Sequence, residues 1–229
     1  MKTKAIACSL LVSLVLALAG PAFAAIPGAP ETTEDGLALV KKSKADILYR
    51  RPGATFGGYT KMLLVEPQIA FEKDWANTYN RDARTQVTAA DLQTIIAKGR
   101  VLLLQEFTKM LEKNGYSLVT AAGDDVLEVR VSLLDLAITV PDPNNNIGQF
   151  NKTYTQSAGS ATLVVELYDS GTGQVLARAY EREAGSAVAK GVARDHSTNV
   201  DDATYAFSMW AKMLVRGLER AKEAETAGK

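Results

Sequence analysis

The residues between 88 and 115 predict one long helix, which limits the possible folds more than any other feature of the chain. Thr88 followed by Asp91 forms an N-cap with an acidic residue at the third helical position, a variant of the capping box. Apolar side chains then recur every three or four residues, and Asn114 with the glycine after it supplies a left-handed stop. Because residues 101–104 are apolar on every side, we expect burial on more than one face.

Strand patterns lie on both sides of this helix. Residues 59–65 predict a strand that should end, bulge or lie at an edge near Pro67, because proline has no amide hydrogen to donate. Residues 116–120 predict a short strand. Residues 159–168 and 174–183 predict an antiparallel hairpin around a Gly-rich turn.

Residues 126–140 form a strand whose alternation changes phase. Apolar side chains occupy the odd positions up to Leu133 and the even positions from Leu134 onward. A shift by one residue sends side chains to the opposite face of a sheet, so we predict a β-bulge or bend at these two leucines.

The last helix is predicted to begin at a cap on Asn199, after a loop over residues 185–198. The predicted order is β-α-β-β-β-β-α. This order is typical of a single α+β domain, with an antiparallel-rich sheet and two long helices packed on it.

Residues 1–24 resemble a secretory signal peptide. Lys2 and Lys4 precede an apolar run, and a small-x-small motif predicts cleavage after Ala24. Cys8 lies near the start of the apolar run, which favours ordinary cleavage over lipid attachment. We expect a periplasmic protein, with secretion less favoured. Residues 25–35 are expected to be a flexible leader, 36–223 one domain and 224–229 a tail.

Composition excludes several classes of function for the cleaved chain. Cys8 is the single cysteine, so cleavage removes all thiol and disulfide chemistry. Loss of Lys2 and Lys4 from 26 basic residues leaves 24 against 26 acidic ones, with no basic stripe that would favour nucleic acid. After cleavage, no apolar stretch is long enough to span a membrane.

Several motifs, spread in order over most of the cleaved chain, resemble a family of exported bacterial proteins known as domain-of-unknown-function family 3313. They are LYRRPGA at 48–54, GYTK at 58–61, VEP at 65–67, FEKDW at 71–75, DVL at 125–127, GSATL at 159–163, YDSGTG at 168–173 and WA at 210–211. The resemblance implies an envelope location and a compact α/β domain, but no activity. Many family members are lipoprotein candidates, and this chain lacks their cysteine at the cleavage site.

Catalytic and metal sites are not expected. His196, the single histidine, lies beside Asp195, but no serine sits in a Gly-x-Ser-x-Gly elbow. The acidic pairs at 124–125 and 201–202 lack EF-hand spacing, and a turn and a helix start explain them. We therefore expect no enzyme, no metal site and no cofactor.

The most prominent polar group lies on the strand predicted at 174–183. Arg178, Tyr180 and Arg182 share one face of that strand. Two guanidinium groups flanking a phenol could bind a carboxylate or phosphate. The alternative, which we favour, is a solvated sheet face on which these residues pair with cross-strand partners such as Glu166.

Two further segments are candidates for contacts. Phe71, Trp75 and Tyr79 recur every four residues, which favours core or helix packing over a ligand site. The polar connection at 141–157 is long enough to be either functional or disordered.

The favoured hypothesis is a non-enzymatic envelope accessory or scaffold that binds another envelope protein. A sheet edge or the 141–157 connection would make the contact, and the chain could also form a homo-oligomer. The alternative is a carrier or sensor for a small anionic or amphiphilic ligand, anchored by Arg178 and Arg182.

Overall fold

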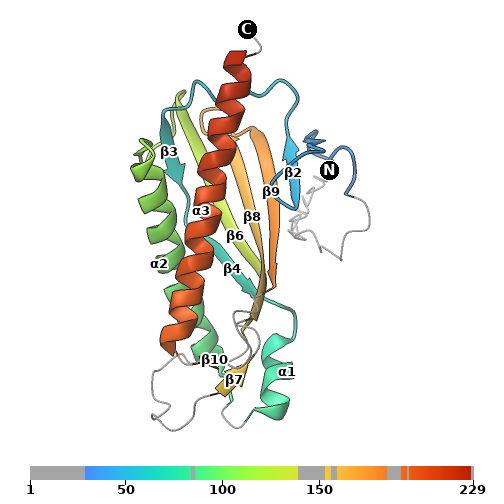
Figure 1. Ribbon diagram of the computed structural model, residues 1–229, viewed down its shortest axis with the longest axis vertical. Coiled ribbons are helices and arrows are strands. Elements are labelled where there is room, and N and C mark those ends of the chain that lie inside the picture. Colours follow the sequence, from blue (N-terminus) through green and yellow to red (C-terminus); the bar gives the residue numbers. More distant parts are fainter. Residues whose placement is uncertain are drawn as a thin grey trace, which may run out of the picture.

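An eight-stranded sheet forms the centre of the fold, and two long helices lie across one of its faces (Figure 1). The computed structural model describes residues 29–83, 86–138, 153–155, 159–184, 192–194 and 196–227. The strands of the sheet are β1 (Ala38–Leu39), β2 (Ile47–Arg50), β3 (Lys61–Leu64), β4 (Gln68–Phe71), β5 (Ser117–Leu118), β6 (Val126–Ile138), β8 (Gly159–Asp169) and β9 (Val175–Ala184). The helices are α1 (Trp75–Asp82), α2 (Ala89–Lys113) and α3 (His196–Ala227). A separate pair contains β7 (Thr153–Thr155) and β10 (Val192–Arg194).

The strand order is β1-β2-β9-β8-β6-β3-β5, and β4 also pairs with β6. Along the spatial order β1-β2-β9-β8-β6, every neighbouring pair of strands is antiparallel. β3 and β4 pair in parallel with β6, and β5 pairs in parallel with β3. This architecture confirms the predicted α+β domain with an antiparallel-rich sheet and two long helices. The short strands β1, β2 and β4 were not predicted, because two to four residues are too few to show a period.

The main core lies between the sheet and the pair α2 and α3. Alternate residues of β6 point into it, beginning with Leu127 and Val129, as the alternation predicted. Phe107 from α2 and Trp210 from α3 pack against the same face. Each fully buried side chain of this size contributes roughly 1.5–3 kcal/mol to folding. No helix in the described part of the chain is long and apolar enough to cross a bilayer.

Pro67 interrupts the strand that runs parallel to β6, as predicted. β3 ends at Leu64 and β4 begins at Gln68, and both pair with β6. Pro67 itself is fully buried between them. The predicted strand therefore ends before the proline, and β4, which was not predicted, follows it.

The predicted bulge in β6 is present, one or two residues beyond the predicted position. The pairing of β6 with β8 shifts register between Leu134 and Ala137. Asp135 lies in this gap with φ of 51°, a left-handed conformation that is uncommon outside glycine. On the partner strand, Gly159 has φ of 140° and lies against the Ala137 carbonyl.

The helix caps were predicted with mixed success. The amide of Asp91 donates to the Thr88 hydroxyl at 3.2 Å, and the amide of Thr88 donates to the Asp91 carboxylate at 2.8 Å, so the capping box is confirmed. The cap predicted at Asn199 is wrong, because α3 already begins at His196. Asp195 immediately precedes His196 in the sequence and is also of a type that caps helices, so residue type alone does not select Asn199.

The N-terminal segment from Ala29 to Val40 lies on the sheet face opposite the helices, and we call it the arm. Leu37 from the arm packs with Tyr49 of β2 and Val175 of β9 in a second, smaller core. The Tyr49 hydroxyl also donates to the carbonyl of Pro30 at 3.0 Å. Part of the segment predicted to be a flexible leader is therefore folded from residue 29, because its apolar side chains find burial against β2 and β9.

Candidate functional site

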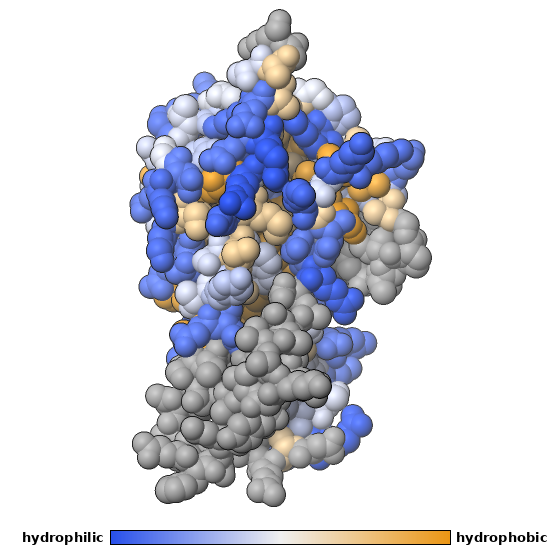
Figure 2. Space-filling view, viewed as in Figure 1, coloured by the Kyte–Doolittle hydropathy of each residue, from blue (hydrophilic) through white to orange (hydrophobic). Residues whose placement is uncertain are grey.

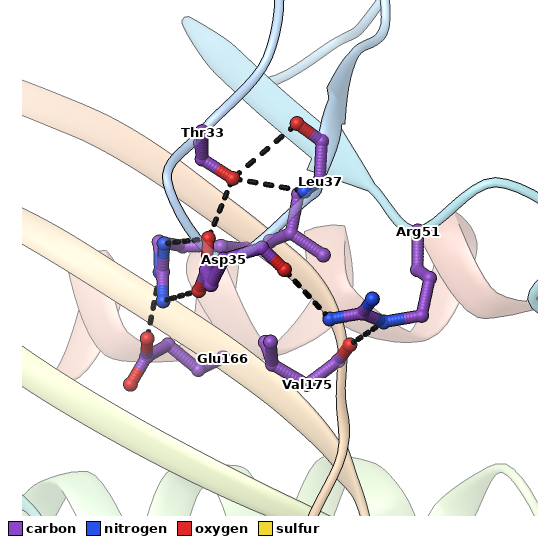
Figure 3. Close-up of polar contacts among 7 residues, drawn as sticks. Thr33, Asp35, Leu37, Arg51, Glu166 and Val175 are labelled. Atoms are coloured by element: carbon purple, nitrogen blue, oxygen red, sulfur yellow. Dashed lines mark hydrogen bonds and ion pairs between the residues drawn. The ribbon is translucent and has the colours of Figure 1, made fainter.

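Arg178 of β9 is held by two carboxylates of its own chain. Its Nε donates to Glu166 on β8 at 2.7 Å, and its Nη2 donates to Asp35 of the arm at 2.7 Å. Glu166 is the residue directly opposite Arg178 in the β8–β9 ladder. Figure 3 shows Asp35 and Glu166 around this guanidinium. The pair of Arg178 and Glu166 is the cross-strand pair that we favoured from the sequence over ligand binding. Asp35 is a second partner that was not predicted.

The charges in this group are stabilised in their ionised forms. Burial lowers the pKa of Arg178, but the hydrogen bonds to Asp35 and Glu166 raise it by more, so the net direction is upward. Burial also raises the pKa of the Asp35 carboxyl, yet the hydrogen bonds from Thr33 and Arg178 leave it below its ordinary value. The Asp35–Arg178 ion pair therefore fastens the arm to the sheet.

Tyr180 and Arg182 continue along the same face of β9 without converging on Arg178. Tyr180 is half-buried opposite Ile47 of β2, and burial raises the pKa of its hydroxyl. Arg182 is exposed, and its Cα lies about 13 Å from that of Arg178 at the usual rise of a strand. A ligand-binding role for these three residues stays a prediction. The guanidinium donors of Arg178 that would bind the ligand already donate to Glu166 and Asp35.

The edge of the sheet at Arg182 is closed by a side chain. β2 pairs with β9 only as far as Tyr180. Beyond that point the amide of Arg182 donates to the Asp46 carboxylate at 2.9 Å, and the amide of Asp46 donates to Glu181 at 3.0 Å. Acidic side chains that occupy edge amides discourage the addition of another strand. This part of the edge is therefore a poor place for the strand addition considered from the sequence.

A second charged pair lies on this face. Arg130 of β6 forms an ion pair with Glu128, and its guanidinium lies 4.1 Å from the centre of the Tyr168 ring. The attraction of a cation to an aromatic face supplements the ion pair. The polar sheet face is therefore neutralised mainly by contacts between its own side chains.

The loop after β2 forms a second polar centre, at the end of the sheet near the C-terminus of α3 (Figure 1). Arg51 donates from Nε to the Val175 carbonyl at 2.6 Å and from Nη2 to the Asp35 carbonyl at 2.9 Å (Figure 3). Arg50 forms an ion pair with Glu225 at 3.1 Å and lies over the Phe56 ring. The two adjacent arginines thus bind the arm on one side and α3 on the other.

Glu225 fixes the end of α3 to the same loop. Its carboxylate accepts hydrogen bonds from the amides of Phe56 at 2.8 Å and Gly57 at 3.0 Å, in addition to Arg50. Burial raises the pKa of Glu225, but these donors lower it by more, so the net direction is downward. No local pattern singles out Glu225, because its partners lie far away in the chain.

Two further contacts close this end of the molecule. The Tyr59 hydroxyl donates to Asp169, the last residue of β8, at 2.6 Å. Burial and the nearby carboxylate raise the pKa of Tyr59, and the hydrogen bond from Tyr59 leads the causes that lower the pKa of Asp169. Lys61 forms an ion pair with Asp125 at 3.0 Å. These side chains act as structural links between three loops.

The family described as "Protein of unknown function (DUF3313)" matches residues 33–214 of the chain. The chain belongs to the DUF3313 family. The resemblance drawn from the sequence motifs is thereby confirmed.

Several motifs that carry the resemblance meet at one end of this DUF3313 domain. The LYRRPGA stretch supplies Arg50 and Arg51, and the GYTK stretch supplies Tyr59 and Lys61. Asp125 comes from the DVL stretch and Asp169 from the YDSGTG stretch. Their recorded contacts are ion pairs and hydrogen bonds within the chain. In this family member, these motifs therefore have a structural explanation in the joining of the arm, the loops and α3.

Solved structures show low-level similarity to the DUF3313 chain. A DUF330 protein from Xanthomonas campestris is 11% identical, with a TM-score of 0.42, over 78% of this chain and 93% of that one. A PelC dodecamer from Paraburkholderia phytofirmans is 10% identical, with a TM-score of 0.35, over 71% and 93%. A DUF4136 protein from Bacteroides thetaiotaomicron is 15% identical, with a TM-score of 0.31, over 72% and 95%. No curated protein matches the chain.

The other sequence candidates have separate outcomes in the DUF3313 domain. Phe71, Trp75 and Tyr79 stack, with ring centres 4.8 Å and 5.4 Å apart, and Trp75 is buried, which fits the predicted packing role. His196 is the first residue of α3, and its side chain lies outside the described residues, as does most of 141–157. Among the residues with described positions, no group of three or more His, Cys, Asp or Glu could hold a metal ion.

One surface of the DUF3313 domain was missed by the sequence analysis. Tyr205 and Met209 lie one turn apart on α3, with exposed fractions of 68% and 45%. Phe207 and Trp210 on the opposite side of the same helix are buried in the core. The signal was present in the sequence, because the apolar residues of α3 are too many for one face.

Proposed function

We propose that this DUF3313 protein is an exported envelope component that binds another protein and catalyses no reaction. The observation that carries the proposal is the exposure of Tyr205 and Met209 beside each other on α3. The signal-like N-terminus supports export to the periplasm. The protein would then serve as an accessory or scaffold in the cell envelope.

Tyr205 and Met209 favour a protein partner because of their chemistry. Tyrosine and methionine are enriched at the centres of protein interfaces relative to the rest of protein surfaces. A single exposed apolar side chain needs no explanation, but an adjacent pair on a rigid helix forms a small patch. Because α3 packs on the sheet through its other side, the patch is held in place before a partner arrives.

The carrier alternative has less support from the described contacts. A site for an anionic ligand needs cations whose donors are free, whereas Arg178 already bonds to Asp35 and Glu166. A ligand would have to displace one of these carboxylates, which costs the ion pair that it replaces. The arrangement on β9 therefore favours a structural role over ligand capture.

Native mass spectrometry of the chain purified from the periplasmic fraction tests the proposal. We expect a complex of fixed stoichiometry with a second protein, and a Tyr205→Ser/Met209→Ser variant that has lost it. Val101→Ser is the matched control, because Val101 is an apolar residue of α2 with an exposed fraction of 55%. A discrete small molecule on an otherwise bare monomer would contradict the proposal and favour the carrier.

A further inference from the structure

The exposed side of α3 continues beyond Tyr205 and Met209 as a row of cations. Lys212, Arg216 and Arg220 are exposed and follow one another at intervals of four residues. Residues four apart lie on one side of a helix, about 6 Å apart along its axis. We call Tyr205, Met209 and these three cations the α3 ridge. Figure 2 views the molecule from the side on which α3 lies, and hydrophilic side chains gather over the upper part of this face.

The cations of the ridge lack the carboxylate partner that several other cations of the domain have. Arg50, Arg130 and Arg178 each bind a carboxylate, as do Lys61 and Arg100. Within the described ranges, no carboxylate lies within ion-pair distance of Lys212, Arg216 or Arg220.

Acidic neighbours on α3 do not neutralise the row. Glu219 and Glu223 are each three residues beyond an arginine, yet neither forms an ion pair with it. The charge of Glu219 instead contributes to raising the pKa of Tyr116, after the larger effect of burial. Like charges four residues apart also weaken a helix rather than stabilise it. The row therefore gains no close ion pair within the described part of α3.

We propose that the α3 ridge is the contact surface of the protein partner, and that the partner presents an acidic surface to it. Carboxylates of the partner would face Lys212, Arg216 and Arg220, and an apolar part of its surface would cover Tyr205 and Met209. This inference rests on the proposed function and adds the place of contact and the charge of the partner. Tyrosine, methionine and arginine are among the residues enriched at protein interfaces, whereas lysine is depleted, so every residue of the ridge except Lys212 is of an enriched type.

The size of the ridge indicates how strong the contact is. Tyr205 and Arg220 are separated by about 22 Å along α3, and a helix is about 10 Å wide. The ridge alone therefore offers much less than the roughly 800 Å² per partner of a standard interface. We expect a moderate affinity that depends on ionic strength, because exposed charges are screened by salt.

Site-specific photocrosslinking in cells that produce the full chain tests the inference first. p-Benzoylphenylalanine replaces Tyr205 in one strain and Arg182, on the opposite face of the molecule, in another. We expect Tyr205 to capture one protein species that Arg182 does not capture, with the crosslinked peptide rich in Asp and Glu. Capture alone is insufficient, so the captured protein is then purified and its affinity for the chain is measured.

Charge removal provides the decisive comparison. The variant Lys212→Gln/Arg216→Gln/Arg220→Gln should bind the captured protein about tenfold or more weakly, since each exposed pair contributes a modest amount. The matched control Lys42→Gln/Lys44→Gln/Lys73→Gln removes the same charge from exposed lysines outside α3 and should bind like the wild type. Circular dichroism verifies that both variants fold.

The possible failures are distinguishable. Unchanged binding by the α3 triple variant, or capture from Arg182 alone, would overturn the ridge while leaving the proposed function intact. Crosslinking of Tyr205 to a second copy of this chain would also overturn it, since the occupant would be the chain itself. Charge-dependent binding to phosphatidylglycerol vesicles, without a protein product, would assign the ridge to a membrane surface. Absence of any captured protein at either position would count against the proposed function as well.

Discussion

The carboxylate of Glu225, near the end of α3, lies 2.8 Å from the backbone amide of Phe56, which precedes it by 169 residues. This contact joins the last helix to the loop after β2. The same carboxylate accepts from Gly57 and from Arg50, so a single side chain satisfies three donors. The LYRRPGA motif and the end of α3 are thereby one structural unit.

Replacement of Glu225 by alanine should destabilise the domain by about 2 kcal/mol, because hydrogen bonds to a charged group are lost and amide donors remain without an acceptor. Urea unfolding measures this loss. The control is Glu223→Ala, an exposed glutamate of the same helix end, which should change the free energy of unfolding by less than about 0.5 kcal/mol. Equal effects of the two variants would show that the Glu225 contact contributes nothing specific.

Acid should destabilise the domain through its depressed carboxyl groups. The pKa values of Asp35, Asp169 and Glu225 are below their ordinary values in the folded chain. A depressed pKa stabilises the fold above the unfolded value, and that stability is lost as pH falls through the folded value. We expect the free energy of unfolding to decrease from about pH 4 downward, and the decrease to be shallower in Asp169→Asn. An equally steep acid limb in that variant would contradict the assignment.

Removal of the guanidinium of Arg178 should release the arm as well as weaken the sheet. Arg178→Ala leaves the carboxylates of Asp35 and Glu166 without their cation, and we expect a loss of about 2 kcal/mol, less than for a fully buried pair. Amide exchange at Leu37 and Leu39 should accelerate more than exchange in β8. The control is Arg182→Ala, which removes an exposed arginine four residues further along the same face of β9. It should leave the free energy of unfolding and the amide exchange nearly unchanged.

The bulge in β6 should be sensitive to side-chain shape at two positions. Asp135→Val places a β-branched residue at φ of 51° and should cost about 1–2 kcal/mol. Asp135→Gly should be close to neutral, because relief of strain offsets the greater freedom of glycine in the unfolded chain. Thermal unfolding compares the two. If valine and glycine were equally tolerated, the left-handed backbone at this position would be disproved.

Gly159, across from the bulge, should tolerate substitution least. A Cβ built there would lie 2.0 Å from the carbonyl oxygen of Ala137. We therefore expect Gly159→Ala to lose more stability in the same thermal measurement than Asp135→Val, since backbone must move to make room. Gly173→Ala meets no atom within 4 Å and has φ of 69°, a left-handed conformation that alanine adopts at lower cost than φ of 140°, so it should lose less stability. Equal losses at both glycines would mean that the close approach to Ala137 is unimportant.

Long periodic segments were predictable from sequence because their pattern repeats. The apolar face of α2 and the alternation of β6 each extend over ten or more residues, so the periodicity of the sequence identifies both elements. The change of phase within β6 is visible for the same reason. Glu166 was also predictable as a partner of Arg178, because a hairpin fixes which residues face each other.

Contacts that depend on tertiary structure were not predictable. Asp35 and Glu225 look like ordinary acidic residues in polar termini, and only the fold brings them to Arg178 and to Phe56. The short strands β1 and β2 form because the arm and β9 lie beside them, which no local pattern indicates. The α3 ridge was not predicted for a related reason: the sequence shows more apolar residues than one face of α3 can bury, but only the assembled core determines which of them are exposed.

If residues 1–24 act as the predicted signal peptide, the docking of the arm from Ala29 onward would couple the folding of the protein to its export. If the exported chain is cleaved after Ala24, only four residues separate the cut from the arm. Fully extended, they span about 14 Å. The peptidase at the membrane surface must therefore cut either before the arm takes its place on β2 and β9 or while the arm is briefly detached. Under that prediction, docking of the arm and cleavage of the signal peptide would compete for the same short stretch of backbone.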